Sequence, residues 1–165
     1  MSIKEGFLIE LERETNSTRK MLDRLKDEHL DFKPHEKSMS LGALAGHVVE
    51  LHNWISGALT KNDFNMATDY VPFRPTSVSE LLRELDEGYK RNEETLNSFP
   101  EEEWYTNWTM RVDNYVIAEM PKIATIRFVI NNHLIHHRGQ LSVYLRLLDI
   151  PVPGMYGPSA DEHKK

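Results

Sequence analysis

The chain has 165 residues, no cysteine and a formal net charge of −6, and eight of its residues are histidine. Without cysteine it can form neither a disulfide framework nor a thiolate metal site. The acidic balance argues against nucleic acid or an anionic membrane as a partner, because both attract clustered Lys and Arg. The length suits a single domain, residues 1–165, with a full hydrophobic core.

The N-terminal residues lack the basic and apolar pattern of a signal peptide. No apolar stretch approaches the roughly 18 to 20 residues that a membrane-spanning helix requires. We therefore expect a cytoplasmic protein.

The first half of the chain contains two helical patterns. Apolar residues recur at helical spacing over residues 3–29, with charged residues on the opposite face. A polar loop around Pro34 follows. The second helix begins after Ser40, which is a typical N-cap residue, and ends near Thr60. One stripe of this second helix holds Leu44, His47, Leu51, Trp54 and Ala58.

Residues 61–76 contain two prolines and are predicted to form a connection across one end of a bundle. A third helix begins at Ser77 or Ser79, where Ser77 and Glu80 have the spacing of a capping box, and ends before Pro100. In residues 101–120, two short β-prone runs flank Asp113-Asn114. They predict a small hairpin or an irregular excursion.

A fourth helix is predicted from Pro121 to about Asp149, and the tail, residues 151–165, shows no helical period. The predicted inner stripe of this helix holds Ile126, Ile130, His133, His137, Leu141, Tyr144 and Leu148. Four long amphipathic helices predict an all-α fold, a four-helix bundle with a small irregular or hairpin excursion before the last helix.

Three histidines lie on the predicted inner stripes. His133 and His137 are four residues apart, so both imidazoles lie on one helix face, about one turn apart. His47 lies on the stripe of the second helix. Three imidazoles that converge predict a site for one divalent ion, zinc or nickel, with further coordination positions open. The alternative is three core histidines with hydrogen-bonded partners, since burying an imidazole unpaired costs on the order of a few kcal/mol.

The neighbouring residues suggest supporting roles, and none stands out as catalytic. His136 points about 100° away from its neighbour in the pair, which predicts a place beside the ligands or on the surface. Gln140 is expected to form a hydrogen bond with a ligand histidine and fix its tautomer. Glu50, one turn beyond His47, is counted with His136, Gln140 and Tyr89 among the residues beside the site or lining its pocket. As a role for it, a solvated helix face is favoured over a general base. Tyr89 is expected in the core or lining a pocket, and Arg138 in a salt bridge or dimer contact.

At these residues the sequence resembles the DinB/YfiT-like metal-dependent bundle proteins. The resemblance lies in residues 40–47, Ser-Leu-Gly-Ala-Leu-Ala-Gly-His, and in residues 133–140, His-Leu-Ile-His-His-Arg-Gly-Gln, which is the more specific stretch. The tail over residues 150–159 is also similar. The resemblance implies an up-down-down-up bundle, a homodimer, and a metal ion held by His47, His133 and His137.

Relatives in that family include thiol S-transferases that use low-molecular-weight thiols such as bacillithiol, and thiol-dependent isomerases. The resemblance thus implies a small-molecule substrate, and three hypotheses follow. The protein conjugates a low-molecular-weight thiol to an electrophilic small molecule, or it is a metal-dependent hydrolase, or it is a non-enzymatic metal- or small-molecule-binding stress-response protein. A requirement for thiol separates the first two hypotheses, and a fourth protein ligand would support the third.

Overall fold

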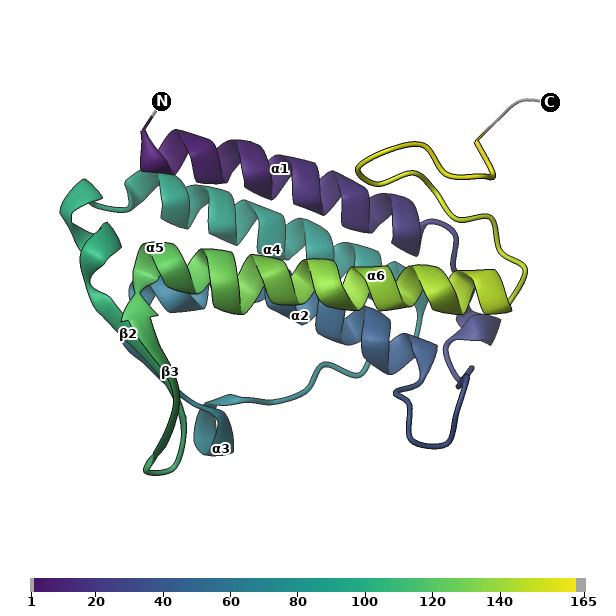
Figure 1. The fold of residues 1–165 in the computed structure, drawn as a ribbon, viewed down its shortest axis with the longest axis horizontal. Helices are drawn as coiled ribbons and strands as arrows, with labels where there is room; N and C mark the ends of the chain where they lie inside the picture. Colours follow the sequence, from purple (N-terminus) through teal and green to yellow (C-terminus); the bar gives the residue numbers. More distant parts are fainter. Residues whose placement is uncertain (1, 163–165) are drawn as a thin grey trace.

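Four long helical segments lie side by side in the computed structural model, which describes residues 2–162 (Figure 1). They are α1 (Ile3–Leu22), α2 (Leu41–Thr60), α4 (Val78–Ser98), and a last segment made of α5 (Lys122–Ala124), a π-helix (Thr125–Asn131) and α6 (Asn132–Leu147). In Figure 1, α2 and α4 run opposite to α1 and α6. The mostly helical character predicted from the sequence is confirmed. The last residues of the predicted tail, 163–165, lie outside the described residues.

The all-α expectation is met only in part, because a small three-stranded sheet lies at one end of the helices (Figure 1). Strand β1 (Asp63–Asn65) pairs in parallel with β2 (Asn107–Val112), and β2 pairs antiparallel with β3 (Tyr115–Pro121). Strands β2 and β3 form the predicted hairpin, with Asp113 in its turn at φ 50°. The segment predicted as a plain connection holds β1 and the short helix α3 (Met66–Asp69). A three-residue strand is too short to show a period.

The predicted first helix is too long, since α1 ends at Leu22. A 3₁₀ turn, Asp27–His29, follows, and there the backbone N–H of Lys26 donates to Nδ1 of His29 at 3.0 Å. Such local bonds between side chain and backbone compete with helix continuation. A second 3₁₀ turn, Glu101–Tyr105, lies between α4 and β2.

The predicted starts of α2 and α4 are confirmed by their caps. The Ser40 hydroxyl accepts a hydrogen bond from Ala43 N, and the Ser77 hydroxyl accepts one from Glu80 N, each at 3.2 Å. The capping box is displaced by one residue, because the Glu80 carboxylate accepts from Thr76 N and not from Ser77 N. Both serines satisfy backbone donors that the first turn of a helix leaves unpaired.

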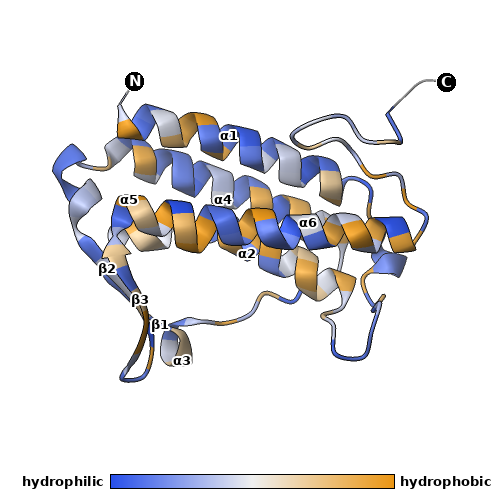
Figure 2. Ribbon diagram, in the orientation of Figure 1, coloured by the Kyte–Doolittle hydropathy of each residue, from blue (hydrophilic) through white to orange (hydrophobic). Residues whose placement is uncertain are grey.

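The helices bury their apolar faces in two main clusters, one toward each end of the molecule. Figure 2 shows that each long helix carries both apolar and polar residues, the pattern of helices with one buried face. One cluster includes Met21, Leu44, Leu81 and Leu145, and the cluster nearer the hairpin includes Phe7, Leu96, Trp104, Trp108 and Ile130. No helix within residues 2–162 combines the length and apolarity of a membrane span.

The predicted inner stripe of the last helix is wrong at His133 and His137, although Leu141 on the same stripe is buried. From Ile126 onward, the buried residues are Ile126, Ile130, Asn131, Leu134, Arg138, Leu141 and Leu145. His133 and His137 lie one residue out of phase with them and are only half-buried. The π-helix explains the difference, because its i→i+5 hydrogen bonds enclose one residue more per turn than those of an α-helix. The pair therefore faces the groove between α2 and α6 instead of the core.

Candidate metal centre

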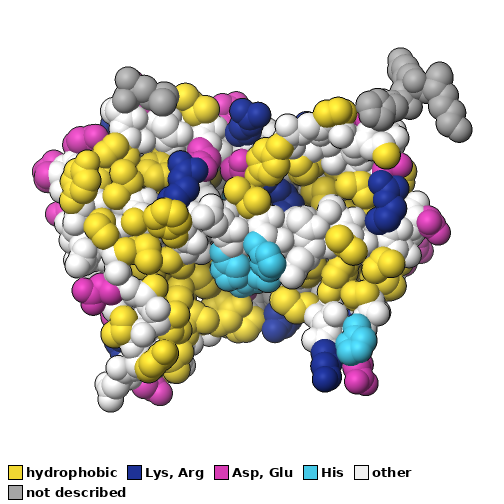
Figure 3. Space-filling model, in the orientation of Figure 1, with side chains coloured by type: hydrophobic (Ala, Val, Ile, Leu, Met, Phe, Trp, Pro, Cys, Tyr) yellow, Lys and Arg dark blue, Asp and Glu magenta, His cyan; other side chains and the backbone are white. Residues whose placement is uncertain are grey.

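The structure brings His47, His133 and His137 together at the groove between α2 and α6. One ring nitrogen of each lies within 4.8 Å of the other two. The Nε2 atoms of His133 and His137 are 2.8 Å apart, and the His47 ring centroid lies 5.1 and 4.9 Å from theirs. Figure 3 shows histidine side chains at the centre of one face of the molecule, with hydrophobic side chains on either side. This group is accessible to small molecules.

The His47 imidazole is oriented by Glu50, one helical turn further along α2. The Nδ1 atom of His47 lies 2.9 Å from a carboxylate oxygen of Glu50. The same oxygen accepts a hydrogen bond from the Tyr70 hydroxyl at 3.0 Å, and the other oxygen accepts one from the backbone N–H of Phe73. Because a carboxylate only accepts, Nδ1 of His47 carries the proton and Nε2 keeps its lone pair.

The expectation that Glu50 lies on a solvated helix face is wrong, since it is only 7% exposed. Residues 70–73, which precede α4, cross this part of α2 and cover the carboxylate. Burial, followed by the Glu50 charge, raises the pKa of Tyr70 to about 12, so that its hydroxyl remains a proton donor at neutral pH.

The predicted hydrogen bond from Gln140 to a ligand histidine is present in the structure. The side-chain oxygen of Gln140 lies 2.7 Å from Nδ1 of His137, which places the proton on Nδ1 and leaves Nε2 free. His136 is exposed, and its ring packs against that of His137 at 5.0 Å without contributing an atom to the group. It lies beside the three histidines, as its helical angle predicts.

Burial favours the neutral form of both histidines of α6. Burial, and then repulsion from His137, His47 and His136, lowers the pKa of His133 to about 4. Burial also lowers the pKa of His137, although its hydrogen bond to Gln140 acts in the opposite direction. Neutral imidazole is the form that binds a metal ion.

The donor set fits a divalent cation. Three imidazole nitrogens suit zinc or nickel, and such a set leaves coordination positions for small molecules. Among residues 2–162, the group of His, Asp and Glu side chains placed to hold an ion consists of these three histidines. The nearest carboxylate named above, that of Glu50, is already engaged by three donors.

Comparison with known proteins places the chain in a family. The DinB family model matches residues 1–164. The chain belongs to the DinB family. Its resemblance to that family, predicted chiefly from residues 133–140, is thereby confirmed.

Relatives of this DinB-family chain extend over its whole length. An uncharacterized protein from Bacillus subtilis, YrdA, is 28% identical over 161 residues, which are 98% of this chain and 92% of the relative. A crystal structure of a DinB-like protein from Bacillus cereus has a TM-score of 0.72 at 31% identity, covering 92% of this chain and 97% of that one. Neither of these two relatives is named for an activity.

Two further crystal structures share the fold. A DinB-like protein from Bacillus subtilis, YjoA, has a TM-score of 0.72 at 18% identity, covering 93% of this chain and 99% of that one. A member from Exiguobacterium sibiricum has a TM-score of 0.61 at 18% identity, covering 90% and 93%. All three structural neighbours agree on the DinB-like arrangement of elements.

Two other predicted residues of this DinB-family protein lie away from the histidines. Tyr89 is on α4, where its hydroxyl donates to Glu93 at 3.0 Å and its ring packs in the hydrophobic cluster near the hairpin. It does not line the histidine group, so its pocket role is corrected to core packing. Arg138 forms a buried salt bridge with Glu14, which was one of its two expected roles.

Sequence reasoning missed Tyr70 and Phe73, which hold Glu50 in place. They lie in a segment without helical or strand period, and Phe73 acts through its backbone N–H, which every non-proline residue has. The one usable signal was the spacing of His47 and Glu50, three residues apart on a single helix.

Proposed function

We propose that this DinB-family protein binds one divalent metal ion, zinc or nickel, through Nε2 of His47, His133 and His137. We further propose that it is a metal-dependent thiol S-transferase built on an up-down-down-up four-helix bundle. The observation that carries the proposal is the orientation of the imidazoles. Glu50 and Gln140 occupy Nδ1 of two of them, and the three histidines converge without a fourth protein ligand among the described residues.

The protein orients the imidazoles and leaves them accessible to small molecules, but it supplies no thiol nucleophile of its own. A bound zinc or nickel ion supplies a positive charge that favours the thiolate form of a low-molecular-weight thiol. The protein has no cysteine, so the nucleophilic thiol has to arrive as a co-substrate. The half-buried position of the histidines leaves room for a thiol and an electrophilic small molecule to approach together.

Two observations favour this reaction over the alternatives. For a hydrolase, Glu50 was the candidate general base, yet its carboxylate already accepts from His47, Tyr70 and Phe73. For a purely structural or binding role, a fourth protein ligand closing the site would be expected. The histidine group within residues 2–162 has three members.

The proposal includes the nature of the partners. The substrate is a small molecule rather than a nucleic acid or a membrane, in keeping with the net charge of −6. The family resemblance supports a homodimer. Size-exclusion chromatography with light scattering measures the assembly directly, and a monomeric mass would remove the homodimer from the proposal.

Metal analysis of purified wild type, His133→Ala and His136→Ala tests the site. We expect one ion per chain in the wild type and in His136→Ala, and loss of the ion in His133→Ala. His136 is the matched control because it is an adjacent histidine outside the group. Equal metal content in all three proteins would overturn the assignment.

The reaction is tested on metal-loaded wild type with glutathione, bacillithiol, cysteine and coenzyme A, each with 1-chloro-2,4-dinitrobenzene or iodoacetamide as electrophile. We expect enzyme-dependent conjugation with at least one thiol, and none with His133→Ala. Hydrolysis of test esters without added thiol would favour the hydrolase instead. A loaded protein that catalyses neither reaction would favour the binding role.

A further inference from the structure

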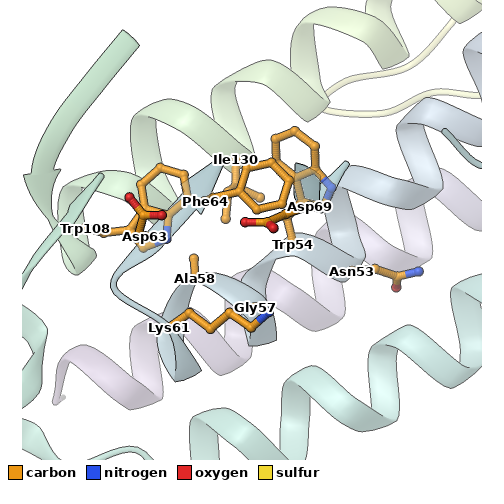
Figure 4. Close-up of a pocket in the computed structure, with 10 residues that line it drawn as sticks. All are labelled: Asn53, Trp54, Gly57, Ala58, Lys61, Asp63, Phe64, Asp69, Trp108 and Ile130. Atoms are coloured by element: carbon orange, nitrogen blue, oxygen red, sulfur yellow. The ribbon is translucent and has the colours of Figure 1, made fainter. Parts of the chain in front are cut away.

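A second feature near the histidines is a largely apolar cavity of about 140 Å³, which lies between α2, the β1–α3 segment, β2 and the π-helix. Its walls include Trp54, Gly57, Ala58, Phe64, Trp108 and Ile130. Figure 4 shows the side chains of Trp54, Phe64 and Trp108 along one side of it, with Ala58 and Gly57 of α2 opposite. Three aromatic rings from α2, β1 and β2 thus surround one small space.

The cavity continues the surface that carries the histidines. Trp54 and Ala58 follow His47 on the same stripe of α2, and Ile130 precedes His133 by three residues. The Trp54 ring stands edge-on to His47, with centroids 6.3 Å apart, and also contacts Phe64 at 5.2 Å. The ring contact with His47 places the cavity next to the histidines, so one small molecule can reach both.

The walls of the cavity are held in place by contacts outside it. Asn92 of α4 inserts into the turn of α2 that carries Trp54, accepting from Ser56 N at 3.0 Å and donating to the His52 carbonyl at 2.6 Å. Strand β1, which carries Phe64, is fixed by pairing with β2 and by two 2.8 Å bonds from Arg111 to Asp63. The cavity is therefore preformed, which lowers the entropy cost of binding.

The size and charge of the cavity define its occupant. An apolar cavity of about 150 Å³ takes up a molecule the size of benzene. At the rim, Asp63 is paired with Arg111. Asp69 accepts hydrogen bonds from Asn65 and Thr68, and together with the nearby charge of Lys61 these lower its pKa. The positive charges of Lys61 and Arg111 balance the negative charges of Asp63 and Asp69, so the rim favours an uncharged ligand group.

We infer that the substrate carries an uncharged aromatic ring, which Trp54, Phe64 and Trp108 bind while its reacting atom lies at the neighbouring histidines. The ring site stands on the cavity alone. Only the position of the reacting atom rests on the proposed function.

Gly57→Leu tests the ring site. A Cβ built on Gly57 meets nothing within 4 Å, and the residue lines the cavity, so leucine adds a side chain at the cavity wall without a Cβ clash. Leucine also favours the helix more than glycine does. Gly6→Leu is the matched control, because Gly6 has equally open space in α1 and lies away from the cavity.

The measurement is a titration with benzyl alcohol, without added metal, followed by NMR of the three indole N–H groups. We expect saturable shifts for Trp54 and Trp108, while Trp104, which is fully buried and does not line the cavity, stays unchanged. Binding should be at least tenfold weaker in Gly57→Leu and equal to wild type in Gly6→Leu. No saturable shift in the wild type, or equal affinity in Gly57→Leu, would overturn the inference.

Because this titration needs neither metal nor thiol, its outcome is separate from that of the conjugation assay. A protein that binds benzyl alcohol but conjugates no thiol keeps the ring site and loses the proposed reaction. A protein that conjugates thiols but does not bind benzyl alcohol keeps the reaction and loses the ring site.

Discussion

At the scale of single residues, Glu50 connects the histidine group to the rest of the chain. Its carboxylate is shared by His47 on its own helix and by Tyr70 and Phe73 from the segment that crosses α2. A partner of this kind fixes both the tautomer and the orientation of an imidazole. The position of that crossing segment is thereby coupled to the direction in which His47 Nε2 points.

Replacement of Glu50 by glutamine keeps the shape of the side chain and removes the charge. An NH₂ group, which only donates, then replaces one carboxylate oxygen. It faces hydrogen-bond donors from among His47, Tyr70 and Phe73. We expect metal affinity to fall roughly 10- to 100-fold, measured by competition with a chromophoric chelator. Glu87→Gln, at an exposed position on α4, is the control and should match the wild type. Unchanged affinity in Glu50→Gln would mean that other contacts hold His47.

His52, which lies outside the histidine group, makes the stability of the fold depend on pH. It is 1% exposed, and its Nε2 lies 2.8 Å from the Thr18 hydroxyl. Burial, followed by the charge of Arg138, lowers its pKa to about 3 from 6.5. Below pH 6.5 the unfolded chain therefore binds a proton at His52 that the folded chain does not. Stability should fall as the pH drops from about 6.5 toward 3.

In His52→Gln, the part of the pH dependence of stability that comes from His52 disappears. Urea unfolding at a series of pH values should show a decline below pH 6.5 that is shallower than in the wild type by up to about 1.4 kcal/mol per pH unit. Above about pH 7.5 the two proteins should have parallel profiles, because the imidazole is then neutral in both states. Parallel profiles at every pH would refute the assignment.

Residue spacing was sufficient to choose His133, His137 and Gln140, because these choices depend on positions within one helix. The choice of His47 also needed the family resemblance, because a single histidine on an apolar stripe is more often a core residue. Spacing was insufficient for Glu50, whose burial depends on a segment 20 to 23 residues further along the chain. Tyr89 was placed on an inner stripe correctly, but the stripe of α4 faces a different part of the core.

At the scale of elements, the starts of α2 and α4 and the hairpin could be predicted because their signals are local. Serine caps and a two-residue Asp-Asn turn lie within a few residues of the structures they set. The phase of the last helix could not be predicted in this way. A regular 3.6-residue period places His133 and His137 in the core, and the π-helix, Thr125–Asn131, shifts the buried positions to Leu134 and Arg138.

Gly46 allows the crossing segment to approach α2. A Cβ at this position would lie 2.9 Å from both the Phe73 carbonyl oxygen and Cδ of Pro75. In Gly46→Ala the segment has to move, and with it the Phe73 N–H that donates to Glu50. We expect a loss of about 1–3 kcal/mol in unfolding free energy, together with weaker metal binding.

The control for this substitution is Gly57→Ala in the same helix, where a Cβ meets nothing within 4 Å. It should gain about 0.5–1 kcal/mol from helix propensity alone. Urea unfolding and metal titration of both variants give the comparison. If Gly46→Ala is as stable as Gly57→Ala, the close approach at Gly46 does not constrain the segment.

At the scale of the whole molecule, a buried charge cluster ties the two ends of the chain together. Arg138 of α6 is 2% exposed and donates to the carboxylate of Glu14 on α1 and to the Tyr156 hydroxyl. That hydroxyl also donates to Glu14 at 2.8 Å. These partners are 124 and 142 residues apart in sequence. No local pattern predicts such contacts, although the order of the helices was predictable.

Tyr156→Phe removes the hydroxyl and leaves the ion pair with one partner fewer. Because Tyr156 is 57% exposed, we expect a loss of about 0.5–1.5 kcal/mol in unfolding free energy, the usual net range for a hydrogen bond. Tyr115→Phe, on the exposed hairpin, is the control and should change stability by less than about 0.5 kcal/mol. Equal stability of the two variants would show that the tail is not anchored through Tyr156.

The π-helix also bears on how relatives should be aligned. Since each of its turns encloses one residue more than an α-helical turn, this stretch can lose a residue and continue as an ordinary α-helix. A relative that is one residue shorter between Pro121 and His133 can therefore present the same two imidazoles to the same groove. A single gap at this place in an alignment would record a change of helix type, with the three histidine positions unchanged on either side of it.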